Sequence, residues 1–114
     1  MIVYNLIKEH DSKELAKKAG LNESTVRRLK KTRSTKADTM LKILNAIGFD
    51  MDSDPIEDVR KALKNRIYPY YVISTISGVP VSTIEGFMYS GRIPLWHNMV
   101  ALGQALDVKF YRDL

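Results

Sequence analysis

Hydrophobic side chains recur along this chain at the spacing of helical turns. Periodic apolar positions predict a helix over roughly residues 2–9 and a second helix over about residues 12–19. Asp11 or Ser12 can cap the second helix, and Gly20 can end it in the left-handed conformation that glycine adopts at little cost. The pattern therefore predicts two short helices followed by a tight turn.

Three more helices are predicted by the same reasoning. Asn22 suits the N-cap of a third helix, whose buried side is formed by Leu21, Thr25, Val26 and Leu29. A fourth helix carries core-spaced apolar residues, Met40, Leu41, Leu44 and Ile47, and Gly48 ends it. A fifth helix begins at Asp54 as N-cap, with Pro55 at its first position and Glu57 three residues after the cap.

After the fifth helix, the pattern of the first half begins again. Seven residues find a similar residue 58 positions later: Leu15, Ala16, Gly20, Ser24, Thr25, Val26 and Leu29 match Ile73, Ser74, Gly78, Ser82, Thr83, Ile84 and Phe87. With one added residue in the following loop, MLKILNAIGFDM from Met40 aligns with MVALGQALDVKF from Met99. Such self-similarity predicts a tandem repeat of two units, residues 1–51 and 52–114.

The segment ELAKKAGLNESTVRRL resembles the helix-turn-helix of the phage-repressor and Cro type, the xenobiotic-response-element-like regulators. Leu15 and Ala16 fall where that family packs its second helix, Gly20 falls at its turn, and Val26 and Leu29 take the buried positions of its recognition helix. The segment TMLKILNAIGFDM resembles the closing helix of the family. The resemblance implies an all-α fold of two small repressor-like units, with four to five helices each when the linker helix is shared.

The resemblance covers nearly all of residues 1–51 and, more loosely, residues 55–110. One stretch departs from the family pattern. The loop after the recognition helix usually runs Asn-Gly-Lys with a later proline, and KKTRSTKAD contains neither glycine nor proline.

The side of the third helix opposite its buried residues is polar and basic. It carries Glu23, Ser24, Arg27, Lys30 and Lys31, with Arg28 at the flank. The resemblance, followed residue by residue, implies base-edge contacts from Glu23, Ser24 and Arg28, assisted by Asn22 or Thr25. It implies phosphate contacts from Ser12, Arg27, Lys30, Lys31, Arg33 and Lys36. Arg28 could pair with guanine and Glu23 could accept a hydrogen bond from cytosine. The plainer alternative is a solvated basic helix face.

In the second copy the same outer arc has lost its cations. It reads Val81, Ser82, Glu85, Met88 and Tyr89, and Gly86 stands in place of Arg28. An acidic and apolar face is repelled by phosphate. We therefore interpret the second copy as a former DNA reader that now binds protein, with Val81, Glu85, Met88 and Tyr89 as the interface. The alternative is that this arc packs onto the first unit.

The charge of the chain divides unevenly between its halves. Residues 1–50 hold 11 Lys or Arg against 6 Asp or Glu, whereas residues 51–114 hold 7 against 7, so the first half carries the whole net charge of +5. This asymmetry favours a polyanionic partner for the first half.

Other classes of protein find little support in the composition. The chain has no cysteine, and His10 and His97 are far apart in sequence, so we expect no enzyme activity, metal site or cofactor. The absence of cysteine favours a reducing, cytoplasmic location. No apolar run is long enough for a membrane span, and the N-terminus lacks the features of a signal peptide.

The sequence thus predicts a transcriptional regulator, most simply a repressor, that binds double-stranded DNA as a homodimer. An alternative is the antitoxin of an addiction module, in which the second unit binds a protein toxin and the first represses its own promoter. Protomers could also pair through the closing segment DVKFYRDL, where Val108 and Phe110 alternate as in an edge strand.

Overall fold

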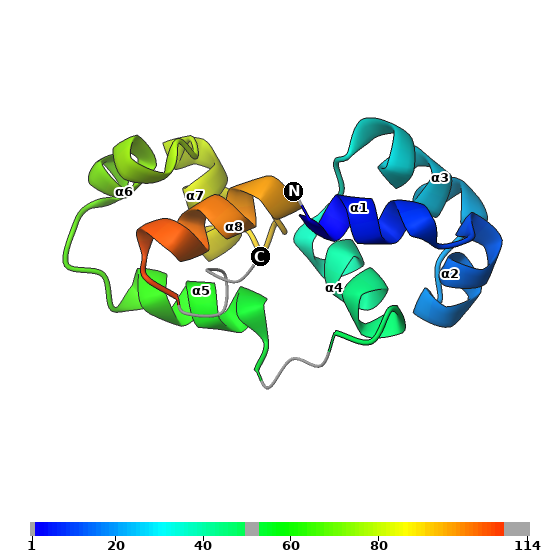
Figure 1. The fold of residues 1–114 in the computed structure, drawn as a ribbon. Coiled ribbons are helices and arrows are strands. Elements are labelled where there is room, and N and C mark those ends of the chain that lie inside the picture. Colours follow the sequence, from blue (N-terminus) through cyan, green and yellow to red (C-terminus); the bar gives the residue numbers. More distant parts are fainter. Residues whose placement is uncertain (1, 50–52, 109–114) are drawn as a thin grey trace.

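The computed structural model describes residues 2–49 and 53–108, and within these ranges it contains eight α-helices and no strand (Figure 1). The helices of the first half are α1 (Ile2–Glu9), α2 (Ser12–Ala19), α3 (Glu23–Thr32) and α4 (Ala37–Ala46). Those of the second half are α5 (Pro55–Lys64), α6 (Tyr70–Ser77), α7 (Val81–Tyr89) and α8 (Trp96–Ala105). The predicted all-α class is confirmed. None of the described helices has the length and apolar character needed to cross a membrane.

Two parts of the sequence-based predictions lie outside the described residues. The boundary between the units, at residues 51 and 52, is one of them. The other is Phe110 of the closing segment.

Of the three N-caps predicted from the sequence, those of α2 and α5 make side-chain capping bonds, whereas Asn22 precedes α3 without one. The side chain of Asp11 accepts a hydrogen bond from the backbone N–H of Glu14 at 3.2 Å, so Asp11 and not Ser12 is the N-cap of α2. Gly20 ends this helix with a φ of 71°. Asp54 accepts from the N–H of Ile56 at 3.0 Å, and Pro55 begins α5 as predicted.

One cluster of buried side chains runs through both halves of the molecule. On α3 the buried residues are Val26 and Leu29, and on α7 they are Ile84 and Phe87. Trp96, at the start of α8, is fully buried. Because the cluster is continuous, each half depends on the other for part of its core.

Backbone geometry recurs between the halves. All six residues with positive φ in the described ranges form pairs: Gly20 with Gly78, Arg33 with Gly91, and Gly48 with Asp107. The first two pairs are 58 positions apart and the third is 59 apart, as in the sequence alignment. The ends of α4 and α8 also share a hydrogen bond, since Phe49 N–H donates to the Leu44 carbonyl at 2.9 Å and Val108 N–H to that of Gly103 at 2.8 Å.

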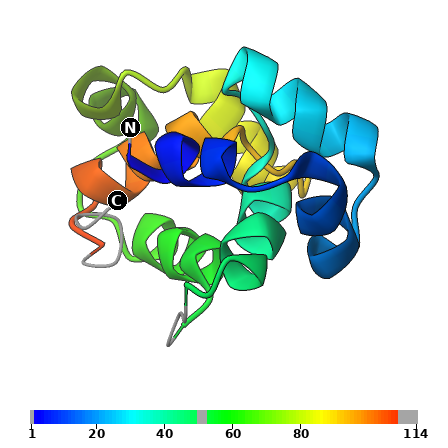
Figure 2. The same ribbon diagram turned by 45° about the vertical axis from the view of Figure 1, so that its right-hand side comes forward.

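The two halves meet where α4 and α8 begin. Lys36 and Leu95 form an isolated antiparallel bridge. Ala37 N–H donates to the Pro94 carbonyl at 2.9 Å, and Trp96 N–H donates to the Thr35 carbonyl at 2.7 Å. From this bridge α4 and α8 extend and pack against each other. In Figures 1 and 2 the junction lies near the middle of the molecule, whereas α3 lies at its periphery.

Candidate nucleic-acid interface

The orientation of α3 is fixed by its buried side. Val26 is 0% exposed and Leu29 is 1% exposed, and α3 packs against α1 and α2. The turn that precedes α3 is closed by a hydrogen bond of 2.8 Å from Leu21 N–H to the Ala16 carbonyl. With one side held in the core, the other side of α3 must face solvent.

The surface predicted to contact DNA comprises residues on α3, residues in the segments that flank α3 and Ser12 at the start of α2. Asn22, Ser24, Arg27, Arg28, Lys31, Arg33 and Lys36 are exposed, and Ser12, Glu23, Thr25 and Lys30 are half-buried. In the described residues, the side chain of Arg28 has no hydrogen bond or ion pair, so its guanidinium can meet a ligand without breaking an internal contact.

Two members of this surface are paired with each other. Arg27 donates to a carboxylate oxygen of Glu23 at 2.7 Å, one helical turn away. The pair is exposed, so it contributes only a few tenths of a kcal/mol to the helix. It nevertheless occupies the Glu23 carboxylate in the free protein, and a base contact from Glu23 would require this pair to open.

Lys30 is tied to the chain itself. Its ammonium donates to the backbone carbonyl of His10, at the junction between α1 and α2. The contact links the end of the third helix to a segment 20 residues earlier. Lys30 therefore has a structural role in addition to any phosphate contact.

The C-terminal end of α3 places Arg33 in an unusual conformation. Arg33 has a φ of 54°, and its N–H donates to the Leu29 carbonyl at 2.8 Å. In the family that the sequence resembles, the loop that begins near this position usually contains a glycine. A residue with a Cβ is strained in this left-handed conformation. The loop thus keeps the helix ending without the glycine, and Arg33 is directed into solvent beside the basic face.

The start of α2 is less suited to phosphate than the sequence suggests. Asp11 already accepts the Glu14 N–H, and its carboxylate places a negative charge beside Ser12. A phosphate at Ser12 would be repelled by that carboxylate, because both carry negative charge. The Ser12 contact stays a prediction.

The arc on α7 that was predicted as a protein interface is smaller than expected. Met88 packs partly against the core and Val81 is half-buried. Tyr89 is 71% exposed, and its hydroxyl is hydrogen-bonded to that of Tyr70 at 3.3 Å. Burial, followed by this hydrogen bond, raises the pKa of Tyr70. Only Glu85 and Tyr89 of the predicted interface are exposed.

One cation near α7 was missed by the sequence reasoning. An added Cβ on Gly86 would lie 3.4 Å from Cδ and 3.8 Å from Cβ of Arg92, so the stem of Arg92 covers this glycine. Arg92 N–H also donates to the Gly86 carbonyl at 3.1 Å. Gly86 therefore packs against its own chain. The periodicity of α7 could not reveal Arg92, because this residue lies in the loop beyond the helix.

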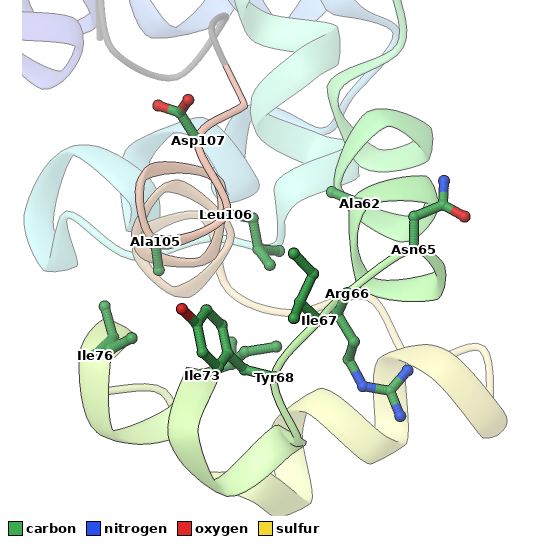
Figure 3. Close-up of a pocket in the computed structure, with 10 residues that line it drawn as sticks. All are labelled: Ala62, Asn65, Arg66, Ile67, Tyr68, Ile73, Ile76, Ala105, Leu106 and Asp107. Carbon is green, nitrogen blue, oxygen red and sulfur yellow. The ribbon is translucent and has the colours of Figure 1, made fainter.

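The second half also contains an apolar hollow of about 380 Å³ between the end of α5, α6 and the end of α8 (Figure 3). Its walls include Ile67, Ile73, Ile76 and Leu106. Ile67 is 91% exposed and Ile76 is 62% exposed. This lining presents aliphatic surface and lies in the half of the molecule away from α3 (Figures 1 and 3).

Comparison of the chain with protein-family models, with curated proteins and with solved structures found no match. A proposal about function therefore rests on the sequence and the geometry of this chain.

Proposed function

We propose that the chain is a tandem pair of helix-turn-helix units and that it regulates transcription by binding double-stranded DNA through α3. In this proposal Arg28 reads a base in the major groove, and exposed cations around it contact phosphates. An α-helix with one buried side and one polar, basic side is the element that fits that groove.

The observation that supports the proposal most directly is the free, exposed guanidinium of Arg28 beside Arg27, Lys31 and Arg33. Basic residues in the last turn of a helix also stabilise the helix dipole, which accounts for Lys30 and Lys31 without any ligand. The dipole does not account for Arg28, which lies in the middle of α3, is exposed and forms no ion pair with a described residue.

Selection of bound sequences from a random DNA pool tests the proposal. The wild-type chain should enrich one short motif. Arg28→Ala should lower affinity for that motif by about 1–3 kcal/mol and bind other sequences much as before. Lys64→Ala removes an exposed cation from α5 and is the matched control. Unchanged binding of the motif by Arg28→Ala would show that Arg28 reads no base.

A homodimer stays a prediction, and Tyr89 is its exposed apolar candidate on α7. The antitoxin alternative is favoured by a different surface, the exposed Ile67 and Ile76 beside the hollow of the second half. If a toxin encoded next to this protein binds there, Ile76→Lys should abolish their co-purification and leave DNA binding by α3 intact.

A further inference from the structure

The contact between the two halves has a local two-fold symmetry. Lys36 and Leu95 are equivalent residues, each directly before the corresponding helix, α4 or α8. Exchanging the halves converts the bond from Ala37 N–H to the Pro94 carbonyl into the bond from Trp96 N–H to the Thr35 carbonyl. Both bonds are present, so the bridge is self-complementary, as in the isologous interface of a symmetric dimer.

This symmetry extends from the bridge into the helices. Lys36 has φ and ψ of −67° and 151°, and Leu95 has −61° and 150°. The chain therefore leaves the bridge in the same direction in both halves, and the axis that relates Lys36 to Leu95 also relates α4 to α8. Each reading helix, α3 or α7, comes directly before its side of this bridge.

Arg92 brings a cation to the position on α7 that corresponds to Arg28 on α3. Gly86 lies 58 residues after Arg28, and the stem of the exposed Arg92 runs across it. The outer side of α7 is therefore not purely acidic and apolar. The guanidinium of Arg92 follows this stem, next to the side of α7 that corresponds to the basic side of α3.

We propose that a single chain, in place of the predicted homodimer, is an internal pseudo-dimer that covers both half-sites of one DNA duplex, with α3 reading the first half-site and Arg92 contacting phosphate over the second. The proposal rests on the proposed DNA-binding function. Half-sites read by two-fold related helices lie about 34–36 Å apart. The molecule as a whole is 43 Å long, so both units fit along a duplex that contains two such half-sites.

The chemistry of α7 determines what the second unit recognises. Glu85 is exposed on this helix, and no described residue of α7 itself is basic. Without a cationic or amide side chain aimed at base edges, the second unit contacts the DNA backbone and leaves the sequence of the second half-site free. The bound site is therefore asymmetric: one defined half-site and one neighbouring turn of any sequence.

The test compares two duplexes that contain the selected half-site, one about 10 base pairs long and one with a further helical turn on the dyad side. The wild-type chain should bind the longer duplex more tightly, and the mass of the complex should correspond to one chain. Arg92→Gln should remove this advantage and lower the salt slope on the longer duplex by about one, with no change on the short duplex. Lys61→Gln, an exposed cation of α5, is the control.

The outcomes separate this inference from the proposed function. If Arg28→Ala weakens binding but Arg92→Gln acts like the control, or if two chains occupy the longer duplex, the pseudo-dimer model is wrong and the function proposed for α3 stands. If neither duplex is bound with sequence preference, the proposed function itself fails.

A gain of function tests the two-fold axis directly. Glu85→Arg combined with Gly86→Arg restores to α7 the two arginines of α3, and the Cβ added at Gly86 meets only the flexible stem of Arg92. This variant should bind an inverted repeat of the selected half-site more tightly than the wild-type chain does. It should gain nothing on a direct repeat. A preference for the direct repeat, or no gain from a variant that circular dichroism shows to be folded, would refute the dyad.

Discussion

α3 and α7 share a buried side and differ on the side that faces solvent. Val26 and Leu29 on α3 correspond to Ile84 and Phe87 on α7, and all four are buried. On the outside, Arg27 and Arg28 correspond to Glu85 and Gly86. The inner residues must fill a close-packed core, so their chemistry is retained in both copies. The outer residues face solvent and are not held by packing, so their chemistry differs between the copies, as the proposed DNA-binding role of α3 requires.

The largest expected effects come from replacing the buried residues that α3 and α7 have in common. Leu29→Ala should lower the free energy of unfolding by about 2–5 kcal/mol, and Phe87→Ala by about 3–5 kcal/mol, because both leave cavities in a shared core. Urea denaturation followed by circular dichroism measures both. Since one cluster joins the halves, each variant should still unfold in a single transition. Two separate transitions would show that the halves are independent.

The two halves also differ in the residue with positive φ that follows the helix. It is Arg33 after α3 and Gly91 after α7. Arg33→Gly should raise the free energy of unfolding by about 1 kcal/mol, because it relieves the strain at a φ of 54°. The reciprocal change Gly91→Arg should lower it by a similar amount. Thermal melts of the two variants, read against the wild-type chain, should move in opposite directions. Shifts of the same sign would contradict the assignment.

The first half also buries a polar group, the hydroxyl of Tyr4. Tyr4 is 7% exposed, and its hydroxyl has no hydrogen-bond partner among the described residues. Removing that hydroxyl with Tyr4→Phe should stabilise the protein by up to about 1 kcal/mol. Chemical denaturation at neutral pH measures this gain. A loss of stability would mean that the hydroxyl is satisfied in solution.

Burial raises the pKa of Tyr4 above its ordinary value of 10.0. Below that pH the phenol is neutral in both the folded and the unfolded chain. Above it the unfolded chain ionises first, so the free energy of unfolding falls as the pH rises. Tyr4→Phe should lose less stability than the wild-type chain between neutral pH and the alkaline range.

The smallest effects come from the lysines at the end of α3. Lys30→Ala should lower the free energy of unfolding by about 0.5–1 kcal/mol, because it removes the hydrogen bond to His10. Lys31→Ala should lower the free energy of unfolding by only a few tenths of a kcal/mol, since Lys31 is exposed and interacts only with the helix dipole. Each variant should bind all DNA sequences more weakly and reduce the salt slope by about one. Equal stabilities of the two variants would show that the Lys30 contact contributes nothing.

The sequence predicted most of the local structure, because the relevant signals lie close together in the chain. Helix spacing, the Asp54–Pro55 start of α5 and the glycine that ends α2 are each contained within a few residues. The sequence repeat, with a spacing of 58 residues and of 59 after the added loop residue, agrees with the positions that share a positive φ in the two halves. The exposure of the outer side of α7 was predicted less well, because periodicity assigns a side of the helix and not how far each side chain is exposed. Met88 was predicted on the outer side of α7, yet its side chain packs partly against the core.

The sequence by itself determined which helices form, where they end and which side of each is buried, since these properties depend on residues within one or two turns of each other. The contacts between distant segments were decided only in the tertiary structure. Lys30 reaches His10, Arg92 covers Gly86, and Lys36 pairs with Leu95. These contacts depend on the paths of the loops and on how the helices pack, which pattern and composition do not encode locally. The fold alone brings Lys36 beside Leu95, and with that pair it relates α4 to α8 by a two-fold axis.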